Sequence, residues 1–340
     1  MFARWMLIVT TAVAGWACAG CAGTDWILGD EAYKATSGPY AVQQEDQIWY
    51  DAARDRYLPV RIYIPEAPYG RHPVIVFSHG LGAAGDQYTY LGQHWASYGY
   101  LAVFPTHMDN HVEAIFNSGP LVRNFVSFGA DSSRWQRQIE DISFILDYLP
   151  QDERLYWLAD MQRVGVAGHS MGAYTANALA GMCIELPDDL RASFRDPRVK
   201  AIVAVSPPGP GLLGLNRDSW VDIAVPCLSI IGTHDIDPST LSPTARRTPF
   251  ETASGPDQYL LTIRAATHGG FNDQTFLPGD RRSFENYHEF VLMASMAFFD
   301  AHLNGDSAGR NWLLAGTLNR LAGSVCTLEF RNVTPTKTQQ

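Results

Sequence analysis

The sequence is poor in positive charge. Lys and Arg together number 25 against 35 Asp and Glu, which gives the 340-residue chain a formal net charge of -10. Proteins that bind nucleic acids obtain much of their affinity from Lys and Arg side chains that neutralise phosphates. The acidic balance therefore argues against a nucleic-acid function, and we expect no nucleic-acid partner.

Long hydrophobic runs are also scarce, and the one at the N-terminus is short. It covers residues 5–17 and follows Arg4, and it falls below the about 20 residues that a bilayer-spanning helix needs. A positive residue, an apolar run and small residues before Cys21 are the layout of a bacterial secretory signal. We predict a signal peptide over residues 1–20, lipidation of the Cys21 thiol and, as a partner, the membrane that holds the lipid.

This prediction places the protein in the bacterial cell envelope as a membrane-anchored lipoprotein, with residues 21–45 as a tether. The match to such signals is imperfect, because Cys18 stands where they usually have Leu. Two alternatives stay open. Ordinary signal cleavage would give a periplasmic or secreted protein, and an uncleaved signal would itself be the anchor.

Only four cysteines remain once residues 1–20 are set aside, and their spacing fits no metal site. They are Cys21, Cys183, Cys227 and Cys326. Cys183 and Cys326 could form a disulfide in an oxidising compartment, but the sequence does not decide this. We expect no metal and no cofactor.

The segment His107-Met108-Asp109-Asn110-His111 is the alternative to that expectation. Two imidazoles and one carboxylate could serve as ligands of a zinc ion. The segment lacks the Glu-containing helix of the zinc peptidases, however. We interpret it as a loop that lines the substrate pocket.

Repeats, low-complexity tracts and convincing linkers are absent as well. Their absence favours a single domain over residues 46–330, followed by a flexible tail over residues 331–340. The domain begins with two alternating runs that flank residues 52–55. This pattern predicts an antiparallel hairpin at the edge of a sheet.

Six short, nearly all-apolar runs follow the hairpin, as expected for parallel strands that are buried on both faces. They cover residues 73–77, 100–104, 164–167, 201–205, 227–231 and 259–263. Helical patterns cover residues 133–149 and 283–303, with Gly305 just beyond the second. The alternation predicts an α/β fold with a mostly parallel, doubly wound sheet and an antiparallel N-terminal edge. In such sheets the chemistry lies at the carboxyl ends of the strands.

A serine between two glycines follows the third of these runs, in Gly168-His169-Ser170-Met171-Gly172. Gly-x-Ser-x-Gly between a strand and a helix is typical of a nucleophile elbow, a sharp turn that exposes the serine hydroxyl. We predict Ser170 as the catalytic nucleophile. The alternative is a tight turn whose serine only caps the helix.

Glycines also follow the first apolar run, in Ser78-His79-Gly80-Leu81-Gly82. Such a loop can direct a backbone N–H toward a reacting carbonyl. We predict an oxyanion hole formed by the N–H groups of Leu81 and Met171, because donors of this kind are worth about 10²–10³ in rate each. His79 and Gly80 are expected in the substrate pocket. The alternative is a plain strand-to-loop turn.

The general base should be a histidine late in the chain. His268 follows the last apolar run and stands before Gly269 and Gly270. An ordinary imidazole has a pKa of about 6.5, which suits proton transfer near neutral pH. We predict His268 as the base.

The acid that orients this histidine should follow the run over residues 227–231. Asp235 lies three residues after Gly232, at the usual distance, and Asp237 is the alternative. The order Ser170, Asp235, His268 along the chain is that of Ser-Asp-His enzymes with a nucleophile elbow. We predict Asp235 as the acid.

A segment rich in Pro and Gly follows the run over residues 201–205, at the same edge of the predicted sheet. Leu212, Leu213 and Trp220 could form an apolar pocket for the acyl or alcohol part of a substrate. The alternative is that these side chains only pack the loop against the domain.

Together the motifs resemble the bacterial predicted dienelactone hydrolases and the platelet-activating-factor acetylhydrolase-like esterases of the α/β-hydrolase superfamily. A more distant likeness is to the cutinase-type polyester hydrolases. The similarity runs from about residue 46 to residue 314. It rests on the hairpin with Asp51 and Arg54-Asp55-Arg56, the two glycine motifs, His268 followed by Phe271, and residues 297–306.

This resemblance implies an α/β-hydrolase fold, a triad of Ser170, Asp235 and His268, and no metal. Dienelactone hydrolases in the strict sense use a cysteine nucleophile, so Ser170 favours ordinary carboxylic ester cleavage. We therefore predict a serine esterase that acts on a small-molecule ester through an acyl-enzyme intermediate. The alternatives are a lipid deacylase, a small peptidase and a non-catalytic surface lipoprotein that retains the fold. The natural substrate and the oligomeric state stay undetermined.

Overall fold

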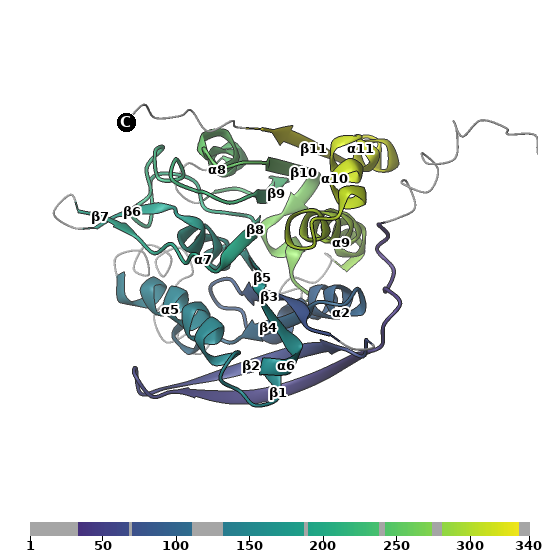
Figure 1. The fold of residues 1–340 in the computed structure, drawn as a ribbon. Coiled ribbons are helices and arrows are strands. Elements are labelled where there is room, and N and C mark those ends of the chain that lie inside the picture. The colour runs from purple at the N-terminus through teal and green to yellow at the C-terminus, as the bar shows by residue number, and fades with distance from the viewer. Residues whose placement is uncertain are drawn as a thin grey trace, which may run out of the picture.

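A computed structural model describes residues 33–67, 70–110, 132–186, 190–237, 242–273 and 281–332. Cys21, the predicted signal peptide and residues 333–340 lie outside these ranges. The centre of the described part is a nine-stranded sheet in the order β1-β2-β4-β3-β5-β8-β9-β10-β11 (Figure 1).

Six neighbouring strands of this sheet run parallel, and each overlaps one of the six predicted apolar runs. They are β3 (His72–Ser78), β4 (Leu101–Pro105), β5 (Ala159–His169), β8 (Val199–Val205), β9 (Cys227–His234) and β10 (Gln258–Thr267). Side chains of these strands are buried on both faces, so the predicted α/β fold with a mostly parallel sheet is confirmed.

Antiparallel strands close both edges of the sheet. At the N-terminal edge β1 (Val42–Asp51) pairs with β2 (Arg56–Pro65) around the predicted turn. At the other edge β11 (Cys326–Arg331) pairs with β10. Because β1 begins at Val42, residues 42–45 belong to the sheet and not to the tether in which we had placed them.

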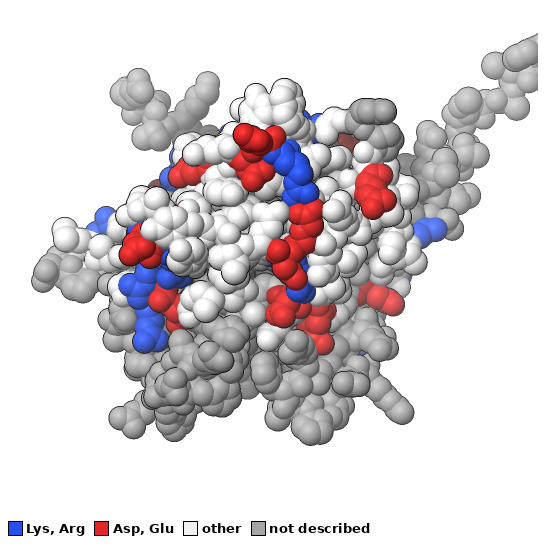
Figure 2. Space-filling model, turned by 90° about the horizontal axis from the view of Figure 1, so that it is seen from below, with Lys and Arg blue, Asp and Glu red and all other residues white. Residues whose placement is uncertain are grey.

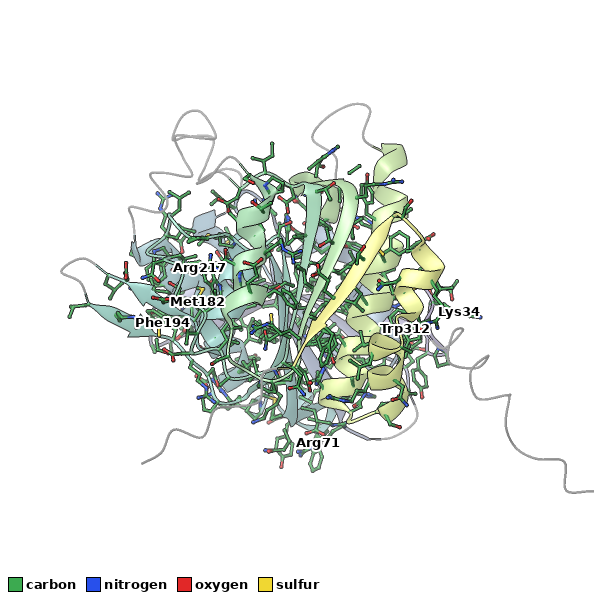
Figure 3. All side chains as sticks on the ribbon, turned by 90° about the horizontal axis from the view of Figure 1, so that it is seen from above. Lys34, Arg71, Met182, Phe194, Arg217 and Trp312 are labelled. Carbon is green, nitrogen blue, oxygen red and sulfur yellow. The ribbon has the colours of Figure 1, made fainter. Side chains whose placement is uncertain are left out.

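The chain before β1 also packs against the domain. Tyr33 is buried and meets Trp312 edge to face, with ring centroids 5.5 Å apart. Figure 3 shows the neighbouring Lys34 beside Trp312, on the opposite side of the domain from Met182 and Phe194. The ordered domain therefore starts at least as early as residue 33.

Helices cover both faces of the sheet (Figure 1). On one face α5 (Ser132–Tyr148) and α7 (Met171–Ala180) pack over β3, β5 and β8. On the other face α2 (Thr89–Ser97) and α9 (Arg281–Leu303) pack over β2, β4, β5, β8, β9 and β10. The side chains packed between the sheet and these helices form a separate hydrophobic cluster on each face.

Shorter elements complete the described fold. The helices are α6 (Leu155–Leu158), α8 (Thr248–Thr252), α10 (Ser307–Leu314) and α11 (Thr317–Ala322), and β6 (Cys183–Glu185) pairs with β7 (Arg191–Ser193) in a separate small sheet. The 3-10 turns are η1 (Gly85–Tyr88), η2 (Met108–Asn110), η4 (Pro243–Arg247) and η5 (His268–Phe271).

Two observations bear on the surface. Acidic and basic side chains lie side by side on the face seen from below (Figure 2), and the hairpin carries the ion pairs Arg61–Asp46 and Arg154–Glu45. Among the described residues no helix has the length and apolar character needed to cross a bilayer.

Cys183, Cys227 and Cys326 are free thiols. The structure therefore contains no disulfide between Cys183 and Cys326, which the sequence had left open.

Candidate active site

The carboxyl ends of the parallel strands meet at one edge of the sheet, and the predicted site residues gather there. Ser170 directly follows β5, Asp235 directly follows β9, and His268 directly follows β10. Parallel pairing places these ends together although the residues are far apart in the chain. The topology therefore brings the three side chains together.

The turn that carries Ser170 is strained. Ser170 has φ 57° and ψ -111°, a backbone conformation that costs a non-glycine residue about 1–3 kcal/mol. A Cβ on Gly168 would lie 2.2 Å from the carbonyl oxygen of Gly172, and a Cβ on Gly172 would lie 1.8 Å from that of Ser78. Only glycine fits at both positions, as the elbow pattern requires.

Ser170, His268 and Asp235 form one hydrogen-bonded chain, here called the rim triad. Ser170 Oγ lies 2.9 Å from His268 Nε2, and His268 Nδ1 lies 2.8 Å from Asp235 Oδ1. The carboxylate can only accept, so Nδ1 carries the proton and Nε2 is left to accept the serine proton. Asp235 is fully buried, whereas 41% of the His268 side chain is exposed, so an oriented base faces the solvent.

The carboxylate of Asp235 is held in its ionised form. Burial alone raises the pKa of this carboxyl, but the contacts with His268, Arg246 and Ser206 outweigh that effect and lower it to about 2. Ser206 donates its hydroxyl to Oδ2 at 2.5 Å, and Arg246 Nε lies 2.9 Å from Oδ1. A negative charge therefore faces the imidazole at neutral pH.

Sequence reasoning missed Ser206 and Arg246. Ser206 carried a signal, because it directly follows the predicted strand over residues 201–205, at the edge where the chemistry was expected. Arg246 lies in the short turn η4, which no periodicity marks.

Asp237, the alternative acid, does not reach His268. It is buried, its Oδ2 accepts the N–H of Gly209 at 2.8 Å, and its backbone forms an isolated bridge with Ser242. The geometry thus brings Asp235 to the histidine and uses Asp237 to hold two loops together.

The loop after β3 approaches Ser170 closely. A Cβ on Gly80 would lie 3.2 Å from the Cβ of Ser170, so glycine allows this approach. Met171 is the first residue of α7, and the first N–H groups of a helix have no partner within it. Within the described chain, neither the N–H of Leu81 nor that of Met171 donates to another residue. Both groups therefore stay candidate donors to a ligand.

A model of the chlorophyllase family matches residues 35–208, which is half of the chain. The chain belongs to the chlorophyllase family. The matched part runs from before β1 to just after β8 and contains both glycine motifs and Ser170. The family is part of the α/β-hydrolase superfamily and consists of carboxylic ester hydrolases. The closer resemblance to dienelactone hydrolases and platelet-activating-factor acetylhydrolases stays a prediction.

Residues 79–82 after β3 are here called the glycine loop. A second Ser-His-Asp chain lies beneath this loop, and we call it the buried triad. It consists of Ser78, His107 and Asp141, all fully buried. Ser78 Oγ lies 3.0 Å from His107 Nε2, and His107 Nδ1 lies 2.9 Å from Asp141 Oδ2. Gln138 donates to Ser78 Oγ at 2.9 Å, so the hydroxyl of Ser78 has two partners in the interior.

Arginines hold the acid of the buried triad, as Arg246 holds that of the rim triad. Arg56 donates two hydrogen bonds to Asp141, at 2.9 and 3.1 Å, and Arg54 Nη1 lies 3.0 Å from Oδ1. Burial raises the pKa of Asp141, but His107 and Arg56 outweigh that effect and lower it. The β1–β2 hairpin is thereby tied to α5.

The buried triad also fixes the glycine loop. The N–H of His107 donates to His79 Nε2 at 2.8 Å, so His79 carries its proton on Nδ1 and donates it to the carbonyl of Gly80, also at 2.8 Å. Gln138 donates a further hydrogen bond to the carbonyl of His79. The prediction that His79 lines the substrate pocket is therefore wrong, because its fully buried ring supports the loop from below.

The same contacts bear on the metal alternative. Both ring nitrogens of His107 are bonded within the buried triad, and Asp109 pairs with Arg56 and Arg137. His111 lies outside the described residues. Over the described ranges no three His, Cys, Asp or Glu side chains are grouped so as to hold a metal ion. His107 itself, fully buried, does not line a pocket.

The apolar pocket predicted after β8 is not formed as expected. Trp220 is fully buried and packs with Leu213 in the hydrophobic cluster under α7, so the packing alternative holds for both. Leu212 is half-buried against the same cluster. A cavity of about 450 Å³ lies beside the β1–β2 hairpin, and no residue of the rim triad lines it.

Proposed function

We propose that the protein is a serine hydrolase that cleaves carboxylic esters through an acyl-enzyme intermediate. The observation that carries this proposal is the chain of two hydrogen bonds, 2.9 and 2.8 Å long, from Ser170 through His268 to Asp235. A nucleophile, a base and an orienting acid at such distances are the minimum for covalent acyl transfer. Membership of a carboxylic ester hydrolase family supports the same reaction class.

The first half-reaction follows from the proton positions. Ser170 Oγ attacks the ester carbonyl carbon while His268 Nε2 takes the hydroxyl proton. Asp235 stabilises the imidazolium that forms and itself stays deprotonated. The imidazolium then gives the proton to the leaving alcohol oxygen, which departs as the alcohol and leaves the acyl group on Ser170.

The second half-reaction repeats these steps with water. His268 accepts a proton from water, the resulting oxygen nucleophile attacks the acyl carbon, and Ser170 leaves with the proton that His268 returns. The N–H groups of Leu81 and Met171 are the proposed donors to the carbonyl oxygen in both halves. They need no reorganisation, because the buried triad and the start of α7 already hold them.

The competing functions differ in testable ways. A lipid deacylase or a small peptidase would use the same rim triad on another acyl compound. A non-catalytic lipoprotein would have no reason to keep a strained Ser170 aligned with His268, since strain of this kind persists where it serves a function. The strained elbow therefore favours an enzyme.

We also retain as a proposal that Cys21 carries a lipid and anchors the enzyme in the bacterial envelope. The support is the layout of residues 1–21. Mass spectrometry of the mature N-terminus in the native host tests this, and a soluble protein that begins elsewhere would exclude the anchor.

A fluorophosphonate probe followed by peptide mass spectrometry tests the enzymatic proposal. We expect one adduct, on Ser170, and hydrolysis of a panel of p-nitrophenyl esters. Chlorophyll, after which the family is named, should be assayed alongside this panel. A folded wild-type protein that neither labels nor turns over any ester would identify a non-catalytic relative, while amide turnover above ester turnover would favour a peptidase.

A further inference from the structure

A buried arginine lies directly behind the rim triad. Arg246, in η4, is only 2% exposed. Its guanidinium donates to four backbone carbonyls, those of Ser206, Pro207, Asp235 and Ile236, at 2.8 to 3.1 Å. Removing an ion from water costs several kcal/mol unless its partners replace the lost hydration. Here the partners come from the ends of β8 and β9, so Arg246 joins the two loops that carry Ser206 and Asp235.

The same guanidinium touches both titratable members of the rim triad. Nε lies 2.9 Å from Asp235 Oδ1, and Nη2 lies 3.3 Å from His268 Nδ1. Nδ1 already carries the proton that it gives to Asp235, so it has no lone pair for a second donor. The Arg246–His268 contact is therefore a close approach of a fixed positive charge to the imidazole.

The other groups that face His268 come from the ends of two strands, β5 and β9. Asp235, at the end of β9, attracts the imidazolium, and Ser170, after β5, is neutral. His169, also from β5, has its ring centroid 4.8 Å from that of His268. Burial, with a contribution from His268, lowers the pKa of His169 well below its ordinary value, so this neighbour is uncharged. Asp237 Oδ2 lies 3.9 Å from Arg246 Nη1.

We propose that Arg246 is a positioning residue of the rim triad. It holds the carboxylate of Asp235 against His268, and its charge disfavours the imidazolium, so that His268 remains able to accept the Ser170 proton at lower pH. This inference rests on the proposed esterase function, because it assigns a role within the same site.

Two substitutions separate the charge from the geometry. Arg246→Gln removes the charge and keeps a donor, so the acid limb of the kcat/KM profile on an activated ester should move up by about one pH unit, a tenfold loss on that limb. Arg246→Lys keeps the charge but lacks the planar fork that binds several carbonyls at once. Its acid limb should stay within about 0.3 pH unit of wild type, whereas kcat should fall about tenfold with little change in KM.

Arg247→Gln is the matched control. Arg247 is the next residue, but it is partly exposed and pairs with Glu251 and Glu329 away from the rim triad. We expect no displacement of its acid limb and no change in kcat. A displacement equal to that of Arg246→Gln would overturn the proposal, because it would then reflect the net charge of the whole protein.

The outcomes are decisive even if one variant does not fold. An unchanged acid limb in folded Arg246→Gln overturns the inference. Should Arg246→Gln fail to fold by circular dichroism, Arg246→Lys decides: a kcat like that of wild type overturns the positioning role, and a tenfold loss at unchanged KM supports it.

A readout that needs no substrate distinguishes this inference from the proposed function. The proton on His268 Nδ1 can be followed by ¹H NMR as pH is lowered, in wild type and in the variants. If no ester is hydrolysed but the midpoint for His268 differs between wild type and Arg246→Gln, the esterase proposal fails and the electrostatic role of Arg246 stands. Equal midpoints in the two proteins would overturn the role of Arg246 alone.

Discussion

Two Ser-His-Asp chains lie in one molecule, and their hydrogen bonds are almost the same length. The serine–histidine and histidine–aspartate distances are 2.9 and 2.8 Å in the rim triad and 3.0 and 2.9 Å in the buried triad. Each acid is buried and paired with arginine. Hydrogen-bond geometry alone therefore does not separate a site that could perform chemistry from a structural network.

The difference lies in the backbone of the serine and in access to the histidine. Ser170 stands at a strained elbow, and its histidine is partly exposed. Ser78 ends the extended strand β3, and both Ser78 and His107 are buried. An ester could approach only the first of the two serines. The comparison teaches that one set of residue types can form both the proposed catalytic triad and a structural network that holds a loop beside it.

Exchange of each serine for alanine should give the largest difference in kcat between the two triads. Ser170→Ala should lower kcat on a p-nitrophenyl ester by on the order of 10⁶ at unchanged thermal stability. Ser78→Ala removes a buried hydroxyl that has two partners, so unfolding should become easier by about 1–3 kcal/mol, while kcat should stay within about tenfold. Steady-state kinetics and calorimetry on the same preparations measure both effects. Comparable losses of kcat in the two variants would contradict the division of roles.

Exchange of each aspartate for asparagine should distinguish the two triads in the same way, with a smaller effect on kcat. Asp235→Asn should lower kcat by about 10⁴, because the amide cannot stabilise the imidazolium. Asp141→Asn leaves buried arginines without their charge partner, so the free energy of unfolding should fall by about 3–5 kcal/mol. The kcat of its folded fraction should be reduced far less than that of Asp235→Asn. Urea unfolding and kinetics of the two variants provide the measurement.

Asp237→Asn is the matched control for the rim acid. It keeps the shape of a buried side chain that accepts the N–H of Gly209, so we expect less than a tenfold loss of kcat. A larger loss than in Asp235→Asn would move the acid of the triad to Asp237.

Acid should weaken both triads in the same direction. The folded state lowers the pKa of Asp235 to about 2 and also lowers that of Asp141. A lowered carboxyl pKa adds stability that is complete above the unfolded value of about 3.9 and is lost as pH falls through the folded value. For Asp235 the whole effect is on the order of 2 to 3 kcal/mol, most of which is lost between pH 4 and pH 2. Urea unfolding from pH 5 down to pH 2.5 should show the decline, and either Asp→Asn variant should show a flatter one.

Chelation should have the smallest effect. Both nitrogens of His107 are bonded within the buried triad, and the proposed mechanism takes its nucleophile and base from the rim triad without a metal. Incubation with EDTA should therefore change the turnover of a p-nitrophenyl ester by less than twofold. If EDTA removed the activity and Zn²⁺ brought it back, the metal hypothesis for the segment from His107 to His111 would have to be reinstated.

The sequence by itself determined most of the fold and the core of the site. Continuous apolar runs mark strands that are buried on both faces, and all six runs became parallel strands. Gly168 and Gly172 marked the elbow, because a side chain at either position would collide with the backbone. Chain order and the ends of the strands placed Ser170, Asp235 and His268 at one edge. These are local signals, which a single segment can carry.

Only the tertiary structure decided what depends on neighbours that are distant in the chain. Arg246 and Asp141 have no local pattern, because their roles come from carbonyls, carboxylates and imidazoles on other strands and helices. His79 looked like a pocket residue because it stands beside Gly80, yet the N–H of His107 draws its ring into the interior. Burial and partner choice are properties of the packed domain, so residue type and spacing could not separate a side chain that meets the substrate from one that supports it.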